Sequence, residues 1–93
     1  MKVNNFLNAA EEIIGRNFNC YSFENDIYGK DIYIRIKIRT YRKSETQSFV
    51  EYTWKYDSDT VENNYEVTLE EFAKEVRELA EEINCAMREN LHI

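Results

Sequence analysis

The clearest hydrophobic pattern in the chain is a strict alternation of isoleucine with polar residues between Lys30 and Thr40. Isoleucine occupies positions 32, 34, 36 and 38, and tyrosine, arginine or lysine separates each from the next. Successive side chains of a β-strand point to opposite sides of the sheet, so this spacing predicts a strand with one apolar face. Burial of each isoleucine contributes about 1.5 to 3 kcal/mol, so this strand is the expected centre of the core.

A second strand is predicted before the isoleucine strand, over residues 18–24, which are rich in aromatic side chains. The pattern leaves open whether the even-numbered residues of this strand or Tyr21 and Phe23 face the core. A turn over residues 25–29 is expected to connect the two strands, with its final glycine supplying a bulge or a positive φ angle.

A third strand is predicted over residues 47–57, where large apolar residues alternate with polar ones. If this strand forms an antiparallel hairpin with the isoleucine strand, matched apolar faces require paired residue numbers to sum to 86 or 88. A sum of 86 is favoured, because it sets Arg35 opposite Glu51 and Asp31 opposite Lys55. A sum of 88 would oppose Asp31 to Asp57.

An amphipathic helix is predicted near the N-terminus, where apolar residues recur at spacings of three and four between Val3 and Ile14. Gly15 is well placed to end this helix, because glycine adopts the left-handed conformation at a helix C-terminus without a steric penalty. Arg16 beyond it suits the negative end of the helix dipole.

A second, longer helix is predicted after the polar residues 58–64. Thr68 followed three residues later by Glu71 is typical of a capping box, and Val67 with Phe72 would form the accompanying hydrophobic staple. The apolar stripe then continues at helical spacing through Leu69, Phe72, Val76, Leu79, Ile83, Met87 and Leu91. Roughly 22 helical residues span about 33 Å, close to the length of a ten-residue strand, so this helix can lie along the sheet.

The predicted fold class is α+β, with a three-stranded antiparallel sheet and two helices in the order αβββα. Both helices are expected on the one apolar sheet face, which makes a two-layer sandwich. A chain of 93 residues is long enough for one modest core and too short for two, so residues 1–93 are expected to form a single domain.

The cysteine content and hydropathy favour a cytoplasmic protein. Cys20 and Cys85 are too few for a disulfide framework and lack the spacing of a metal site, which indicates free thiols in a reducing compartment. No apolar run approaches the roughly 18 residues needed to span a bilayer, and residues 1–15 are amphipathic rather than signal-like. We therefore expect no membrane association.

The net charge of -6 conceals two unequal halves. Residues 1–43 carry eight basic against five acidic residues, a net charge of +3, whereas residues 44–93 carry four against thirteen, a net charge of -9. Such a division is a reason to look for an electrostatic partner.

The acidic residues of the second half define a candidate partner-binding surface on the long helix and the segment before it. Its eight members are Asp57, Asp59, Glu62, Glu66, Glu71, Glu75, Glu78 and Glu82. At 100° per residue, the last four share one flank of the helix, where Glu89 also falls, whereas Lys74 and Arg77 lie on the other flank. This ridge has two interpretations: a solvated face that keeps the protein soluble, or a binding surface for a basic partner.

The outer face of the sheet is a second candidate surface, where basic side chains alternate with aromatic residues such as Tyr33 and Phe49. Phe49 would be exposed there in either register. Basic and aromatic side chains together can bind single-stranded nucleic acid, but the overall acidity disfavours it. Homodimerisation or a partner contact through this face is therefore the alternative function.

No motif in the sequence points to catalysis. The single histidine, His92, is the penultimate residue, so a Cys–His or Ser–His pair would lack a rigid scaffold. No glutamate lies in an apolar setting suited to acid catalysis, and glycine-rich phosphate loops are absent. We expect no enzymatic activity, no cofactor and no metal.

In size, element order and distribution of acidic residues, the chain resembles the small acidic inhibitors encoded by phages and mobile elements, notably anti-CRISPR proteins that combine a three-stranded antiparallel sheet with flanking helices. Bacterial immunity proteins that neutralise basic toxins share this outline. The resemblance implies a non-enzymatic inhibitor whose acidic helix and loop bind a basic, nucleic-acid-handling effector, such as a nuclease or a CRISPR effector. It rests on outline rather than on a motif, so it transfers no site residues.

Overall fold

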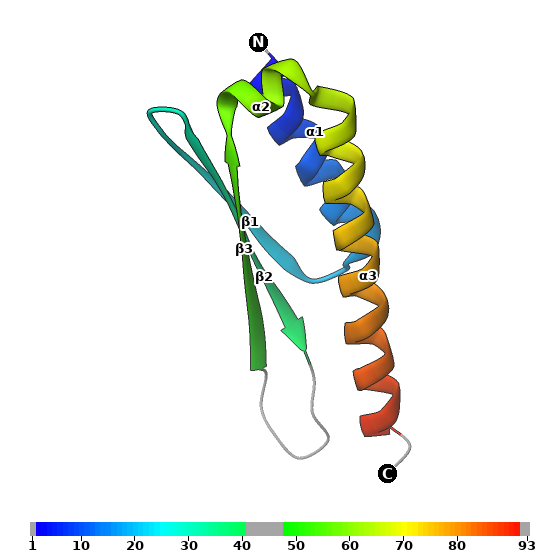
Figure 1. Ribbon diagram of the computed structural model, residues 1–93. Helices are drawn as coiled ribbons and strands as arrows, with labels where there is room; N and C mark the ends of the chain where they lie inside the picture. The colour runs from blue at the N-terminus through cyan, green and yellow to red at the C-terminus, as the bar shows by residue number, and fades with distance from the viewer. Residues whose placement is uncertain (1, 41–47, 92–93) are drawn as a thin grey trace.

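The computed structural model describes the backbone of residues 2–40 and 48–91 and the side chains of residues 2–39 and 49–83. A helix is followed by three strands and two further helices. In chain order these are α1 (Lys2–Asn17), β1 (Tyr21–Tyr28), β2 (Asp31–Thr40), β3 (Ser48–Asp57), α2 (Ser58–Asn63) and α3 (Tyr65–Leu91). Figure 1 shows α1 and α3 on the same side of the sheet, with α3 running along its length. The predicted αβββα order is confirmed, with α2 as an additional short helix.

The sheet is antiparallel with the strand order β1-β2-β3, so the isoleucine strand is central. The four isoleucines of β2 are at most 3% exposed. They pack against apolar residues of both helices, including Phe6, Ile14, Phe72 and Val76. The prediction that β2 anchors the core is confirmed.

The predicted boundaries of the first strand were wrong. β1 begins at Tyr21 and continues to Tyr28, through the residues predicted to turn. A two-residue turn at Gly29 and Lys30 suffices, because Gly29 adopts a φ of 61°, the first central position of a type II′ hairpin turn. The odd-numbered residues of β1 share the face of the isoleucines, and Phe23 packs against the core.

The favoured register of β2 with β3 was also wrong, because paired residue numbers sum to 88 and Asp31 lies opposite Asp57. The ion pairs used to favour 86 still form, but diagonally: Arg35 Nε lies 3.5 Å from Glu51 Oε1, and Lys55 Nζ lies 4.0 Å from Asp31 Oδ1. Long basic side chains reach diagonal neighbours, so these pairs do not select one register over the other. The predicted loop near residue 43 lies outside the described residues.

Asp57 also has a local role that the charge pattern did not reveal. It is the N-cap of α2, and its side chain accepts hydrogen bonds from the backbone amides of Asp59 and Thr60. This short helix was predicted as a polar loop, because six residues provide little periodic signal. Val61, which is fully buried, anchors α2 to the core.

Gly15 does not end the first helix, which continues to Asn17. The Asn17 side-chain amide donates to the carbonyl oxygen of Ile13 at 2.8 Å and so completes the last turn. Gly15 serves a different purpose, since a Cβ atom there would lie 3.0 Å from the Tyr21 hydroxyl. The glycine allows β1 to approach the helix closely.

The predicted capping box at Thr68 was wrong as well, since α3 begins at Tyr65. Thr68 is buried, and its amide donates to the carbonyl oxygen of Asn64 at 2.9 Å, as in a helix already under way. Val67 is 57% exposed and forms no hydrophobic staple. The apolar stripe is otherwise confirmed up to Ile83, and the side chains of Met87 and Leu91 lie outside the described part.

None of the described helices combines the length and the apolar character needed to cross a membrane.

Candidate functional site

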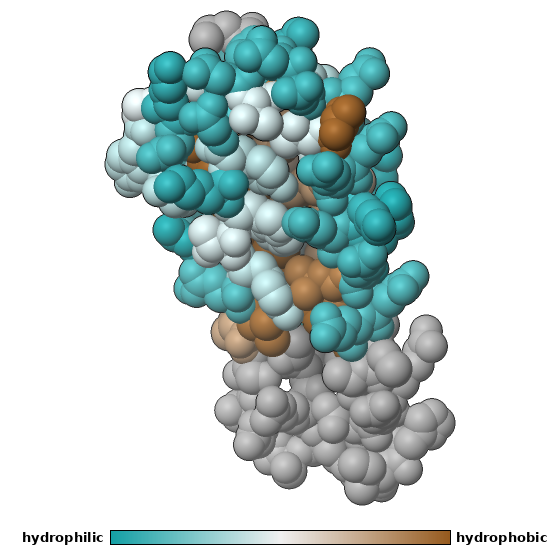
Figure 2. Space-filling view, in the orientation of Figure 1, coloured by the Kyte–Doolittle hydropathy of each residue, from teal (hydrophilic) through white to brown (hydrophobic). Residues whose placement is uncertain are grey.

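Four carboxylates stand in a row on one side of α3, beside the open edge of β3. This acidic flank consists of Glu71, Glu75, Glu78 and Glu82, all of which are exposed. The three from Glu75 onward line a groove of about 290 Å³ together with Tyr52, Thr53, Trp54 and Leu79. Figure 2 shows hydrophilic residues along α3 and apolar surface in the hollow between this helix and the sheet. The site therefore combines charge with an apolar floor.

The aromatic side of the groove comes from β3, whose inward-facing apolar residues are only half-buried because the strand forms an edge of the sheet. Trp54 packs edge-on against Phe72 with ring centroids 5.0 Å apart. Its indole Nε1 donates to Glu75 Oε2 at 2.8 Å. This hydrogen bond ties one carboxylate of the acidic flank to the sheet and orients it across the groove.

The electrostatic influence of the acidic flank extends to the tyrosines of β3. Burial, assisted by the charges of Glu75 and Glu71, raises the pKa of Tyr56. The pKa of Tyr52 is raised mainly by burial and, to a smaller extent, by the charge of Glu82. The charges of the acidic flank therefore reach the tyrosines of β3, with burial as the larger cause of both shifts.

No described cation neutralises the acidic flank. Ion pairs among the described side chains involve Glu12, Glu24, Asp31, Glu51 and Asp59. At 100° per residue, Lys74 lies about 40° around the helix from Glu78, and Arg77 lies about 100° from it. Neither forms an ion pair with the acidic flank among the described side chains. The side chain of Glu89, predicted to continue the ridge, lies outside the described part.

The other four predicted residues do not join this row. Asp57 caps α2, and Asp59 Oδ2 accepts from Lys30 Nζ at 2.9 Å, a contact that raises the pKa of Lys30. The backbone oxygen of Glu62 accepts from Lys2 Nζ at 3.3 Å. Glu66 is exposed in the first turn of α3, about 140° around the helix from Glu71. These carboxylates lie at the α2 end of the molecule rather than along the groove.

Sequence reasoning missed the contribution of Tyr52 and Trp54 to the site, because their alternation assigned them to the core. The signal that could have identified them was their place on the last of three strands. An edge strand packs against fewer neighbours, so its inward side chains remain partly accessible.

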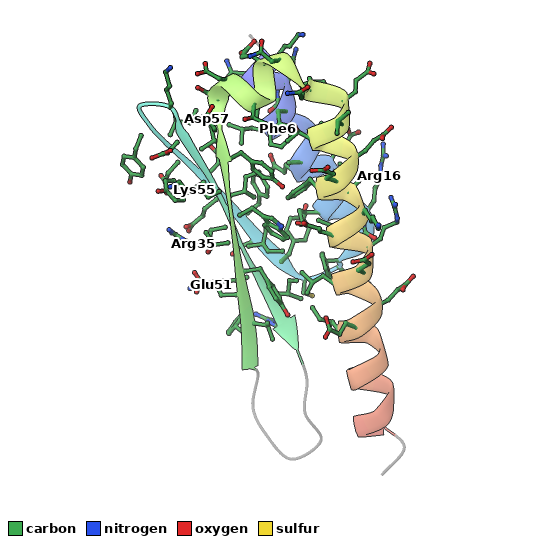
Figure 3. The ribbon with its side chains drawn as sticks, viewed as in Figure 1. Phe6, Arg16, Arg35, Glu51, Lys55 and Asp57 are labelled. Atoms are coloured by element: carbon green, nitrogen blue, oxygen red, sulfur yellow. The ribbon has the colours of Figure 1, made fainter. Side chains whose placement is uncertain are left out.

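The outer sheet face carries a second, mixed surface, with Arg35, Glu51 and Lys55 projecting away from the helices (Figure 3). Arg35 pairs with Glu24 at 3.3 Å as well as with Glu51, and Lys55 Nζ lies 5.9 Å from the ring centre of Tyr33. Opposite charges therefore compensate each other over this part of the face.

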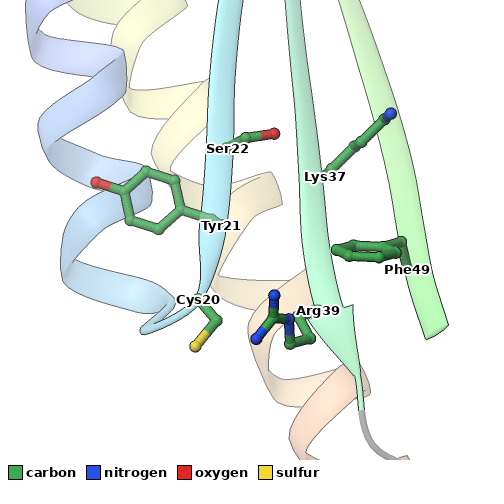
Figure 4. Close-up of a pocket in the computed structure, with 6 residues that line it drawn as sticks. All are labelled: Cys20, Tyr21, Ser22, Lys37, Arg39 and Phe49. Carbon is green, nitrogen blue, oxygen red and sulfur yellow. The ribbon is translucent and has the colours of Figure 1, made fainter. Parts of the chain in front are cut away.

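One end of the outer face is basic and aromatic. Phe49 is 57% exposed, as predicted, and the guanidinium carbon of Arg39 lies 5.8 Å from its ring centre. Both line a hollow of about 350 Å³ with Lys37, Ser22, Tyr21 and Cys20. Figure 4 shows Lys37, Arg39 and Phe49 on one side of the sheet, while Tyr21 points toward α1.

Among the described side chains, those of residues 2–39 and 49–83, no group of three or more histidine, cysteine, aspartate or glutamate residues is arranged to hold a metal ion. Cys20 is exposed as a free thiol, and the side chains of Cys85 and His92 lie outside the described part.

No protein-family model, curated protein or solved structure matches this chain.

Proposed function

We propose that this protein is a non-enzymatic inhibitor that binds a basic protein through the acidic flank of α3 and the adjoining groove. The observation that carries the proposal is the exposure of four carboxylates without a described cationic partner, next to a half-exposed Tyr52 and Trp54. A row of like charges at helical spacing is mutually destabilising in the free protein. A cationic partner would relieve that repulsion on binding.

The chemistry of the groove favours arginine over lysine on the partner. Guanidinium groups form bidentate contacts with carboxylates and stack on aromatic faces, and Glu78, Glu82 and Tyr52 offer both features. Exposed ion pairs contribute only about 0.2 to 1 kcal/mol each, so the aromatic floor is needed for specific affinity. The negative potential would mainly accelerate encounter with the partner.

A basic surface that handles nucleic acid is the target that these features suit best. Such a surface is built to receive phosphates, and carboxylates of the acidic flank would occupy it in their place. Four charges over about 16 Å of helix are sparser than the one charge per roughly 1.7 Å of duplex DNA. The inhibitor would therefore block a limited patch of the effector rather than imitate an extended duplex.

Fluorescence of Trp54, the single tryptophan of the chain, provides a direct test at the groove. We expect an arginine-rich peptide to change Trp54 emission, with an affinity that falls as salt rises. Reversing Glu71, Glu78 and Glu82 to lysine should weaken binding at least about a hundredfold, the effect of some 2.7 kcal/mol.

The matched control reverses Glu66, Glu70 and Glu81, which changes the net charge equally but on the other side of α3. We expect this variant to lose much less affinity than the flank variant, with circular dichroism and melting temperature similar in both. Equal losses would reduce the interaction to non-specific charge attraction. An effector captured from the native host would then be assayed for nucleic-acid binding with and without the protein.

A second candidate function is homodimerisation or partner binding through the outer sheet face, favoured by the exposed ring of Phe49. Sedimentation across a concentration range distinguishes the candidates. A dimer that dissociates on Phe49→Ser substitution would support it, whereas a monomer at high concentration would leave homodimerisation without support.

A further inference from the structure

The outer edge of β1 carries backbone groups with no partner among the described residues. β1 is an outer strand of the sheet, and the amide of Arg39 donates to the carbonyl oxygen of Cys20 at 3.1 Å. Hydrogen bonding in an antiparallel ladder alternates between residues. The even-numbered residues of β1 therefore bond to β2, and the odd-numbered residues direct their amide and carbonyl groups to the open edge. These residues are Tyr21, Phe23, Asn25 and Ile27.

This edge lacks several features that usually prevent another strand from adding to a sheet. Its pairing with β2 runs without a bulge, the strand contains no proline, and its odd-numbered side chains are uncharged. The edge of β3 differs. The Ser58 amide donates to the Lys30 carbonyl oxygen, so the even-numbered residues of β3 bond to β2. The odd-numbered residues, which direct their backbone groups to the open edge of β3, include the charged Glu51 and Lys55.

The apolar side of β1 is also incompletely covered. Ile27 lies opposite Ile32, on the sheet face that carries the core, yet it is 48% exposed. Figure 1 shows that the end of the β1–β2 hairpin projects away from the helices. A strand added at this edge would cover Ile27 and continue the apolar face beyond Phe23.

We propose that the β1 edge binds an extended segment of a partner protein in which apolar residues alternate with basic ones. This mode is β-augmentation, in which backbone hydrogen bonds provide affinity and alternate side chains provide specificity. Apolar residues of the segment would pack beside Phe23 and Ile27. Its basic residues would lie on the outer face, where β1 presents Asp26, which forms no ion pair among the described side chains, and Glu24, which Arg35 contacts at 3.3 Å.

Charge on the helix side of the edge points to the same occupant. A hollow of about 440 Å³ beside Tyr21 is lined by Glu11, Glu12 and Arg16 of α1. Glu12 pairs with Arg16 at 3.4 Å, and Glu11 forms no ion pair among the described side chains. A basic residue near the end of the segment would approach Glu11.

A second copy of this chain fits the edge less well. A continuous sheet requires paired residues on the same face, so the numbers of paired β1 residues must sum to an even value. Two registers meet this condition and pair the largest number of residues. One places Glu24 opposite Glu24 of the other copy, and the other places it opposite Asp26. Like charges directly opposite each other are destabilising.

The test uses two synthetic peptides, one that alternates valine with arginine and one that alternates valine with glutamate. We expect the first to slow hydrogen exchange at the amides of Phe23, Asn25 and Ile27 by at least about tenfold, and the second to have no effect. The experiment is run on the full chain and on the variant with Glu71, Glu78 and Glu82 reversed to lysine. Protection at β1 in both would separate this site from the acidic flank.

Asn25→Pro removes one edge amide without disturbing the bonds to β2, since proline is tolerated where the amide faces solvent. We expect it to weaken the arginine peptide about tenfold. The control Asn25→Thr keeps the amide and should bind as the parent does, and amide spectra verify that both variants fold. Equal binding by the two variants, equal protection by the two peptides, or protection that requires the acidic flank would overturn the proposal. Concentration-dependent protection without peptide would instead assign the edge to a second copy of the chain.

Discussion

The two charged surfaces of this protein are built in opposite ways. On the outer sheet face, Arg35 of β2 contacts Glu24 of β1 and Glu51 of β3, so charges from three strands compensate each other. On the acidic flank, all the carboxylates come from one helix, and none forms an ion pair among the described side chains. The contrast follows from how each element displays its sequence.

Strand pairing sets different stretches of the sequence side by side, so opposite charges can be matched across the ladder. A helix displays only its own residues along a flank, at spacings of three and four. Glutamates repeated at that spacing remain unmatched unless a cation of the same helix or of another element reaches them, and Lys74, four residues before Glu78, forms no ion pair among the described side chains. The unmatched flank is held in place by the core beneath it, which gives it a defined shape for a partner to recognise.

The largest expected effect comes from Phe72→Ala, because Phe72 is fully buried under the acidic flank and contacts Phe6, Trp54 and Tyr56. Loss of this ring should lower the free energy of unfolding by about 3 to 5 kcal/mol, as measured by urea denaturation. The exposed counterpart Phe49→Ala should change it by less than about 0.5 kcal/mol. Similar effects at both positions would contradict the division between a core-supported flank and a solvated outer face.

A smaller loss of stability is expected at alkaline pH, through the ionisation of Tyr56. An unfolded tyrosine ionises near pH 10, whereas burial raises the pKa of folded Tyr56. The stability that this group contributes is therefore complete below about pH 10 and is lost as the pH rises toward the folded pKa. The loss should stay below about 1.4 kcal/mol per pH unit, since the ring is half-exposed. The urea midpoint of the Tyr56→Phe variant should decline less steeply with pH above pH 10 than that of the parent protein. Equal slopes for the two proteins would count against a raised pKa of Tyr56.

Asp57 lies where β3 meets α2 and combines a capping role with a charge that faces Asp31. Asp57→Ala removes the N-cap and should destabilise the protein by about 1 kcal/mol. Asp57→Asn keeps a capping side chain and removes the charge opposite Asp31, so it should be neutral or stabilising. Thermal denaturation of the two variants side by side measures the difference. Equal destabilisation by both would mean that the charge at this position matters more than the cap.

The smallest effects contrast the two surfaces directly. Arg35→Gln leaves Glu24 and Glu51 without their shared cation and should cost about 0.5 to 1 kcal/mol. Glu78→Gln relieves repulsion with Glu75 and Glu82, and Glu78 has no ion pair with Lys74 to lose, so the protein should be stabilised by about 0.2 to 0.5 kcal/mol. Chemical denaturation should therefore show changes in the free energy of unfolding that have opposite signs for the two variants. If Glu78→Gln is destabilising, the charge of the acidic flank is compensated within the chain.

The interior of the protein could be predicted from the sequence more fully than its boundaries. The alternation in β2 and the stripe of α3 identified the buried faces, because burial of apolar side chains is the dominant favourable term in folding. Element ends depend on weaker terms. Gly15 and Thr68 carry good stop and start signals, yet both helices run past them because packing on the sheet outweighs a cap worth about 1 kcal/mol.

The candidate site was predicted in part. Glutamates at helical spacing identified the row from Glu71 to Glu82, because residues on one helix keep fixed angular relations. Sequence reasoning could not place Asp57 at a helix cap, since the six residues of α2 provide little periodic signal. It could not pair Asp59 with Lys30 or bring Trp54 to Glu75, since each of these contacts joins segments whose relative position was unknown.

Periodicity within single segments is enough to predict the apolar faces of β2 and α3, the α+β order and the line of charge on the last helix. The register of β3, the acidic groove with its aromatic floor and the open edge of β1 are visible only in the folded molecule, because they depend on which segments lie side by side. Long ion-pairing side chains and half-buried edge residues are compatible with more than one such arrangement.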